Sequence, residues 1–186
     1  MFASLSILAC TKDEPQNTQT INLQNDGYVE QGNRTFIETP NAGEEVAVTL
    51  GPVPNTFQVT FVTFLFGGTG QVQTSRDVVL KIYKDNGAAT PGFLLFDATY
   101  NVPSSNSLLY QLDIRDKDII VEGGGSIRVS FECVDDKGFP SFAQEFDGLY
   151  DPGRNWIKDP FGFWKNNDIG GVSGNWVIRA IVEENM

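Results

Sequence analysis

The sequence contains no histidine among its 186 residues, and this absence removes several classes of active site. Ser-His-Asp and Cys-His nucleophile pairs need an imidazole base, and histidine-ligated zinc sites need an imidazole ligand. Cysteine occurs twice, which is too few for a thiolate zinc site. Most hydrolase mechanisms therefore lack their residues here, and we predict that the protein is not an enzyme.

Long apolar runs, amphipathic helices and an excess of basic residues are also missing. No segment shows the i, i+3, i+4, i+7 spacing of a capped helix, and the apolar run at 1–9 falls short of the roughly 20 residues that cross a bilayer as a helix. Thirteen Lys and Arg against 24 Asp and Glu give a formal charge of −11. Because this charge repels phosphate backbones, we expect no nucleic-acid partner.

Short apolar runs separated by turn residues fill the chain beyond residue 25 and predict an all-β protein. Turn residues recur about every eight to twelve positions, which is typical of an antiparallel β-sandwich of jelly-roll or Greek-key type. The predicted strands are 45–50, 56–66, 77–83, 93–100, 107–114, 119–122, 126–134 and 175–182. Both faces of the strand at 56–66 are apolar, so we expect this strand to be central and covered on both sides.

Two residues of these strands are predicted to belong to the core. Cys133 lies in an apolar strand, where a thiol packs as a small hydrophobic group. Trp176 shares one strand face with Ile178, Ala180 and Val182.

The N-terminal segment carries a pattern for lipid attachment. The apolar run ends in Ile7-Leu8-Ala9-Cys10, which resembles the lipobox of bacterial lipoproteins. The resemblance implies that Cys10 is lipidated and that acyl chains join the protein to a membrane. The run lacks the preceding Lys or Arg of a secretory signal, which we attribute to a start codon assigned too far downstream. The alternative is that Cys10 is an ordinary thiol in an N-terminal tail.

The residues after Cys10 bear on location and domain organisation. Lys12-Asp13-Glu14 resembles the Lys-acidic-acidic export signal of some Gram-negative surface lipoproteins, which implies the outer membrane and an exposed position on the cell surface. The stretch to Gln24 is polar and aperiodic, as a linker is. We therefore divide the chain into a truncated signal peptide at 1–9, a flexible tether at 10–25 and one β-sandwich domain at 26–186.

A long irregular segment at 140–174 holds two of the three tryptophans and is the candidate functional region. Tyr150, Trp156 and Trp164, with Phe161 and Phe163 nearby, are candidates for an aromatic platform on which a glycan stacks. The alternative, which we favour, is that Trp156-Ile157 and Phe161-Gly162-Phe163-Trp164 are hydrophobic anchors that pin this segment to the sandwich.

The same segment is rich in oxygen ligands. Asp147, Asp151, Asn155 and Asp159 are candidate ligands for calcium, although their spacing does not fit an EF-hand. Together with Glu145, these aspartates also offer the carboxylate pair of a glycoside hydrolase. Because Asp and Asn readily begin turns, we favour solvated turn residues over both the metal site and the catalytic pair.

Several short strings of the chain share a turn-rich character. They are Tyr83 through Pro91-Gly92, Ile127-Arg128-Val129, Pro140-Ser141-Phe142-Ala143, Asn155-Trp156-Ile157 and Gly174 through Ala180. In these strings the chain resembles uncharacterised jelly-roll-like modules of secreted and lipid-anchored bacterial surface proteins, which implies the fold and no functional residue. We expect a lipid-anchored, non-catalytic binding or structural module whose partner is a glycan or another envelope protein.

Overall fold

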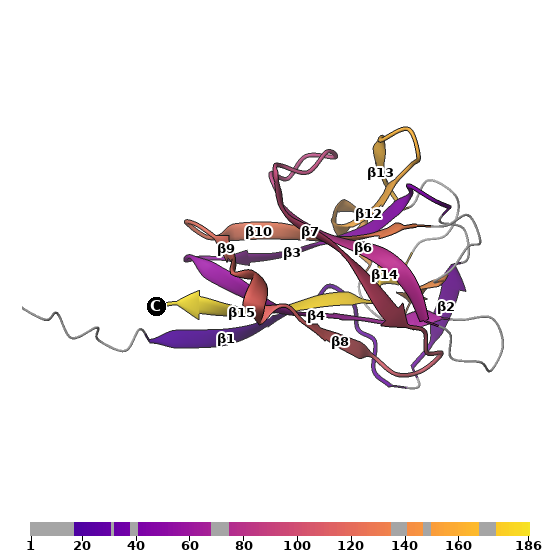
Figure 1. Ribbon diagram of the computed structural model, residues 1–186, viewed down its shortest axis with the longest axis horizontal. Helices are drawn as coiled ribbons and strands as arrows, with labels where there is room; N and C mark the ends of the chain where they lie inside the picture. The colour runs from indigo at the N-terminus through magenta and orange to yellow at the C-terminus, as the bar shows by residue number, and fades with distance from the viewer. Residues whose placement is uncertain are drawn as a thin grey trace, which may run out of the picture.

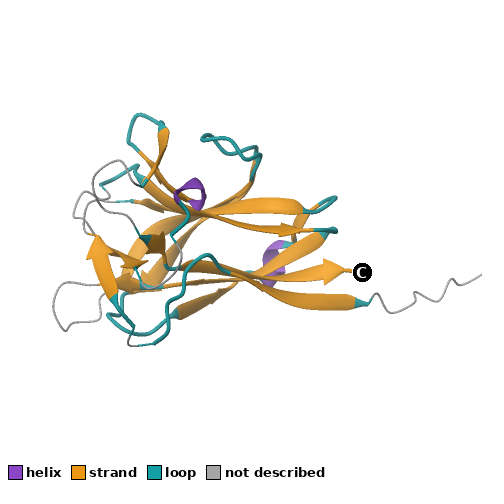
Figure 2. Ribbon diagram, turned by 180° about the vertical axis from the view of Figure 1, so that it is seen from behind, coloured by secondary structure: helices purple, strands orange, loops and turns teal. Residues whose placement is uncertain are grey.

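Two antiparallel β-sheets lie face to face and form the body of the protein (Figures 1 and 2), which confirms the predicted all-β sandwich. The computed structural model describes residues 17–30, 32–37, 41–67, 75–134, 141–146, 150–167 and 174–186. Within these residues, no helix is both long enough and apolar enough to span a membrane.

The first sheet has five strands in the described part of the chain. In order they are β1 (Thr18–Leu23), β15 (Ile178–Asn185), β4 (Phe57–Phe64) and β8 (Tyr110–Asp113), and β9 (Ile119–Val121) also pairs with β4. A short 3-10 helix, η1 (Arg115–Lys117), connects β8 to β9. We call this layer the five-stranded sheet.

The second sheet has six strands in the order β13 (Trp164–Asn166), β12 (Asn155–Lys158), β3 (Glu45–Val53), β10 (Gly125–Cys133), β6 (Ser75–Lys84) and β7 (Leu94–Pro103). We call it the six-stranded sheet. A smaller sheet at one end combines β14 (Asn175–Trp176), β11 (Ser141–Glu145) and β2 (Arg34–Ile37), and β5 (Phe66–Gly67) pairs with β11. The second 3-10 helix, η2 (Pro152–Arg154), directly precedes β12.

The core fills the space between the two large sheets. Alternation along β3 turns Val46, Val48 and Leu50 inwards, each at most 1% exposed. Phe64 of β4 meets Phe131 of β10 edge-on across the layers, with 4.8 Å between ring centroids. Cys133 and Trp176 are each 1% exposed, which confirms both predictions of core positions.

A β-bulge interrupts the alternation predicted for residues 56–66. Val59 pairs with Val182 and Phe61 pairs with Ile181, so Thr60 is an extra residue in β4. The bulge shifts the alternation by one position, and Phe61 comes to lie half-buried on the outer face. The strand is central as predicted, but the prediction that both of its faces are covered is wrong, because an unbroken two-residue period was assumed.

The sandwich begins earlier than the sequence suggested. Strand β1 lies inside the stretch expected to be a tether, and it pairs with β15 over six residues from Thr18 to Leu23. Leu23 is 8% exposed and Ile21 packs against the core. Two apolar residues in a polar stretch are a weak strand signal, and the edge of β15 supplies the hydrogen-bonding partner that makes the strand stable.

Candidate functional site

Charged, aromatic and hydroxyl side chains from five strands and from the loop after β6 meet on the outer face of the six-stranded sheet. We call this set the outer-face network; its members are Glu45, Lys81, Tyr83, Asp85, Arg128, Ser130, Glu132, Trp156, Lys158 and Trp164. Strand register brings them together, since Lys158 lies opposite Glu45 and Glu45 lies opposite Glu132. Residues directly opposite each other share a sheet face, so positions far apart in sequence become neighbours.

Glu45 is the centre of one half of this network. Its side chain has no exposed surface, and its carboxylate accepts hydrogen bonds from Lys81 Nζ at 2.8 Å and from Lys158 Nζ at 2.6 Å. Tyr83 and Ser130 donate their hydroxyls to the other carboxylate oxygen. Burial by itself raises the pKa of Glu45, but the bonds from Lys158, Lys81 and Ser130 outweigh it and lower the pKa below its usual value. Glu45 is therefore ionised at neutral pH.

The neighbours of Glu45 are also held in one protonation state. Burial raises the pKa of Tyr83, and the negative charge of Glu45 raises it further. Burial lowers the pKa of Lys81, but hydrogen bonds to Glu132 and Glu45 outweigh it and raise the pKa above its usual value. At neutral pH Tyr83 keeps its proton and Lys81 keeps its charge.

Arg128 is the centre of the other half. Its side chain is fully buried, and its guanidinium lies 4.1 Å from the ring centroid of Trp156 and 5.3 Å from that of Trp164. Asp85, also buried, accepts from Nη2 at 3.2 Å. The guanidinium further donates to the backbone carbonyls of Ala88 at 2.8 Å and Ala89 at 2.6 Å. Burial lowers the pKa of Arg128, against the opposing effect of Asp85. One side chain thus ties the β6–β7 loop to the β12–β13 hairpin.

Trp156 and Trp164, the candidates for a sugar platform, are brought together around this guanidinium. Trp156 is 7% exposed, and its indole nitrogen donates to Thr49 at 3.0 Å. Trp164 is half-buried and meets Tyr83 edge-on, with centroids 6.1 Å apart. The third candidate, Tyr150, forms a hydrogen bond through its hydroxyl with Asn167. Arg128 lies over a face of both tryptophan rings, as in the anchoring role that we favoured.

The candidate calcium ligands are engaged in local backbone contacts. Asp151 accepts from the Gly153 amide at 2.9 Å, and Asp159 accepts from the amides of Phe161 and Phe163 at 3.1 and 2.9 Å. These are the turn contacts that short acidic side chains commonly make.

Asn155 and Glu145 are buried in the small-sheet end of the molecule. The Asn155 side chain donates to the Asp151 carbonyl and to Asn175, each at 3.0 Å, and accepts from the Trp176 amide at 2.9 Å. Glu145 accepts from the Gly27 amide at 3.0 Å. Asp147 lies outside the described residues. Among the residues that the structure describes, no three acidic or cysteine side chains are grouped to hold a metal ion.

The tip of the β12–β13 hairpin presents two phenylalanines to solvent. Phe161 is 86% and Phe163 is 70% exposed. The turn beneath them is fixed by the two bonds to the Asp159 carboxylate, by a Gly162 amide donating to the Asp159 carbonyl at 2.9 Å, and by the Asp159 amide donating to the Phe163 carbonyl at 3.0 Å. Gly162 has a φ of +92°, which favours glycine.

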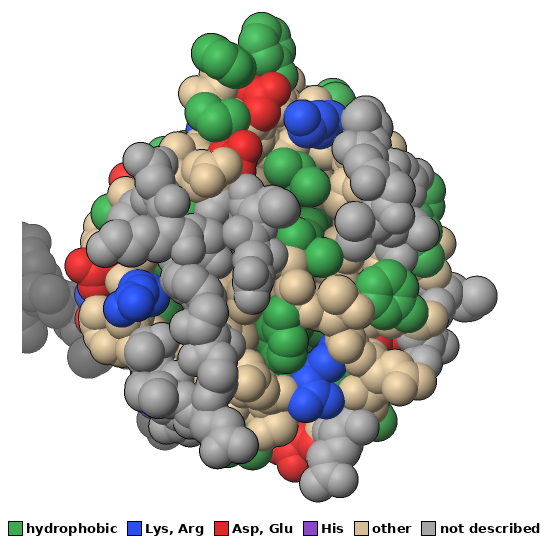
Figure 3. Space-filling model, turned by 90° about the vertical axis from the view of Figure 1, so that its right-hand side faces the viewer, with side chains coloured by type: hydrophobic (Ala, Val, Ile, Leu, Met, Phe, Trp, Pro, Cys, Tyr) green, Lys and Arg blue, Asp and Glu red, His purple; other side chains and the backbone are tan. Residues whose placement is uncertain are grey.

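The hairpin projects from the outer face of the six-stranded sheet, on the same side as the β6–β7 loop (Figure 1). Figure 3 shows hydrophobic side chains gathered on this uppermost projection. Phe93, at the end of the β6–β7 loop, is a third exposed phenylalanine at 66%. The favoured interpretation of Phe161 and Phe163 as hydrophobic anchors against the sandwich is wrong, because the turn held by Asp159 presents both side chains to solvent. The sequence analysis gave Phe93 no functional role.

Sequence reasoning also missed Glu45, Lys81 and Arg128. The available signal was a charged residue inside an apolar strand, as in Ile127-Arg128-Val129.

Comparisons of the chain with protein-family models, with curated proteins and with solved structures found no match.

Proposed function

We propose that this protein is a non-catalytic module of the bacterial outer membrane, anchored through lipid on Cys10 and facing outwards, that binds another envelope protein through the β12–β13 hairpin. The observation that carries the proposal is the fixed turn that holds Phe161 and Phe163 in solvent. An exposed aromatic pair on a rigid support is the arrangement that anchors protein interfaces, because little conformational entropy is lost on binding.

The binding free energy that the two phenylalanines can contribute suits a partner with an apolar pocket. Burying one phenylalanine side chain contributes roughly 1.5–3 kcal/mol, so two supply several kcal/mol at one point of contact. The tip by itself is small, and Phe93, at the end of the β6–β7 loop, is a further exposed aromatic side chain. We infer that Phe161 and Phe163 enter the pocket and that the β6–β7 loop contributes to the surrounding contact.

The outer-face network supports the interaction by fixing the base of the hairpin. Arg128 and Glu45 bind both the sheet and the hairpin strand, through Trp156 and Lys158 respectively. Burying these charges costs desolvation free energy. We infer that the contacts made by the buried charges hold the hairpin in a single position. The lowered pKa of Glu45 also supports a non-catalytic role, since an ionised carboxylate bound to two lysines is not a general acid.

The orientation of the fold agrees with an anchor at Cys10. Strand β1 starts at the end of the molecule that lies away from the β12–β13 hairpin (Figure 1). A chain that joins Cys10 to Thr18 spans at most ~3.5 Å per residue, which keeps that end of the sandwich near the bilayer. The phenylalanines would then face away from the membrane, towards other envelope components.

Site-specific photocrosslinking tests the interface. A benzophenone amino acid in place of Phe161 should give one dominant crosslinked protein in intact cells of the native host, because the side chain is seated in a partner's pocket. The matched control replaces Ile120, which is 48% exposed on the five-stranded sheet and should give no such product. Equal products from both positions, or none from position 161, would contradict the interface.

Metabolic labelling tests the anchor separately. Cells given radiolabelled palmitate should incorporate label into the wild-type chain, expressed with its upstream codons, and Cys10→Ser should abolish the label because the thioether cannot form. Cys133→Ser is the matched control and should keep the label, since this thiol is 1% exposed in the core. Label that persists in Cys10→Ser would refute lipid attachment at that residue.

A further inference from the structure

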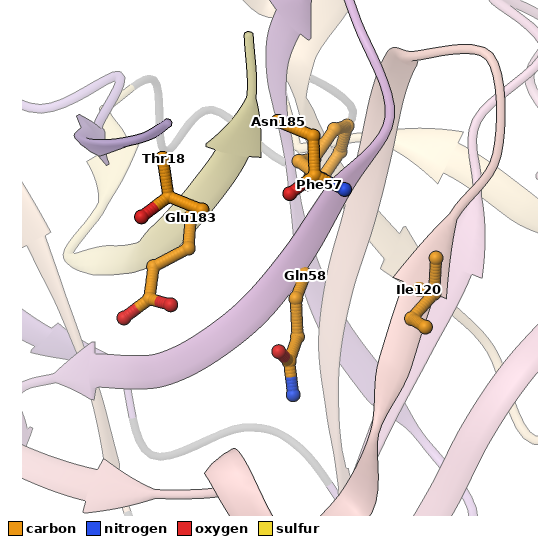
Figure 4. A pocket seen from close by; sticks show the side chains of 6 residues that line it. All are labelled: Thr18, Phe57, Gln58, Ile120, Glu183 and Asn185. Atoms are coloured by element: carbon orange, nitrogen blue, oxygen red, sulfur yellow. The ribbon is translucent and has the colours of Figure 1, made fainter. Parts of the chain in front are cut away.

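The outer face of the five-stranded sheet carries two hollows that the hairpin site does not use. The first has a volume of about 250 Å³ and is lined by Thr18, Phe57, Gln58, Ile120, Glu183 and Asn185. Figure 4 shows that the strands β1, β15, β4 and β9 contribute these side chains. The second has a volume of about 320 Å³, and its polar lining includes Asn22, Gln24, Thr63, Gln111 and Arg179.

Strand register places the two hollows in line along β15. Glu183 pairs with Gln58 at the first hollow, and Arg179 pairs with Thr63 at the second. Between them Ile181 pairs with Phe61, the residue that the bulge turns to the outer face. At roughly 3.4 Å per residue, the distance from Glu183 to Arg179 is ~14 Å, so an elongated ligand can occupy both hollows across an apolar ridge.

The polar groups of this face are mostly carboxamides and hydroxyls. Gln111 and Asn22 each offer both donors and acceptors, and Thr63 offers a hydroxyl that does both. Gln58 offers its side-chain oxygen, while its amide donates to the Arg115 carbonyl at 3.2 Å. Such groups match neighbouring hydroxyls of a sugar, which also donate and accept. Ile181 and Phe61 provide a surface for the CH groups of a sugar ring. Arg115 lies 4.9 Å over Phe61, but it and its partner Asp113 are exposed, so it can move aside at small cost.

The charges of this face select against an anionic ligand. Arg179 in the second hollow is already bound by Asp26, whose two oxygens each accept from Nε at 3.1 Å. No Lys or Arg is among the described residues that line the first hollow, and Glu183 adds a negative charge there. With a net charge of −11, the protein repels uronic-acid and phosphate polymers.

We propose that this face binds a segment of a neutral polysaccharide that lies along β15 and spans both hollows. The site is independent of the proposed hairpin interface and is on the opposite side of the sandwich. The protein would thus hold a glycan on one face and a protein partner on the other.

A glycan array with the full-length chain in detergent tests this site. Neutral oligosaccharides longer than a disaccharide should bind, uronic-acid oligosaccharides should not, and Gln58→Ala/Gln111→Ala should weaken the Kd about tenfold through two lost hydrogen bonds. Phe161→Ala/Phe163→Ala is the matched control and should bind the glycan normally, although it loses the protein partner. Thermal unfolding of both variants should match the wild type, because these side chains are on the surface.

Three results would overturn the glycan site: no neutral oligosaccharide bound above background, a preference for uronic acids, or an unchanged Kd in the glutamine variant. None of them bears on the photocrosslink at position 161. A missing crosslink with normal glycan binding would reject the hairpin interface alone, so the two proposals fail separately.

Discussion

Replacing Arg128 with alanine should lower the free energy of unfolding by about 3–5 kcal/mol, because it leaves the buried carboxylate of Asp85 without its cation. The same change removes the guanidinium from between Trp156 and Trp164 and frees the carbonyls of Ala88 and Ala89. Urea unfolding followed by circular dichroism measures the loss. Tryptophan fluorescence of the folded variant should also change, since both indoles lose their cationic neighbour.

Two further variants test the cause of this loss. Asp85→Asn in the Arg128→Ala background should recover part of the stability, because a neutral amide replaces the uncompensated charge. Arg115→Ala removes a partner of Asp113 on the surface and should leave the unfolding midpoint nearly unchanged, since that pair is solvated. A small effect of Arg128→Ala, similar to that of Arg115→Ala, would show that Arg128 does not hold the hairpin.

Replacing Glu45 with glutamine should cost about 3 kcal/mol at neutral pH, because Lys81 and Lys158 lose their shared carboxylate. The effect should depend on pH in a defined direction. The pKa of Glu45 is lowered in the folded state, so its contribution is complete above the unfolded pKa of about 4.3 and is lost as the pH falls through the folded value. The gap between wild type and Glu45→Gln should therefore narrow in acid.

Urea midpoints at about pH 7 and about pH 3 measure both parts of this prediction. Asp113→Asn is the control, because its carboxylate is also hydrogen-bonded to an arginine but is exposed to water. A stability gap for Glu45→Gln that stays constant or widens towards acid pH would mean that Lys81, Lys158 and Ser130 do not favour the ionised form. Loss of the photocrosslink at position 161 in this variant would connect the network to the position of the hairpin.

Much of the sandwich could be predicted because its longer strands alternate or are apolar throughout. Residues 126–134 and 77–83 were predicted within two residues of Gly125–Cys133 and Ser75–Lys84. The strand β1 and the bulge at Thr60 could not be predicted in the same way. Strand β1 depends on its pairing with β15, which lies at the opposite end of the chain. The bulge is an exception to the two-residue alternation on which the strand prediction was based.

The candidate site was predictable only in part. The density of aromatic residues pointed to Trp156 and Trp164, and the structure does bring them together. Their roles depend on Arg128, whose proximity follows from strand register and not from sequence spacing. Glu45 and Lys81 were missed for the same reason: 36 residues separate them, and only the folded sheet places them 2.8 Å apart.

The pairing of β1 with β15 determines how the domain would carry a mechanical load. Strand β1 runs along the long axis of the molecule (Figure 1), and Met186 donates its amide to the Asn17 carbonyl at 3.0 Å beside its start. A pull on Asn17, opposed by a partner held at Phe161, acts along this strand. The ladder of six residue pairs is then loaded in shear, with its bonds resisting together instead of opening one by one. With the proposed anchor at Cys10 and the proposed interface at Phe161, tension would load this ladder along the strand, where its bonds resist together.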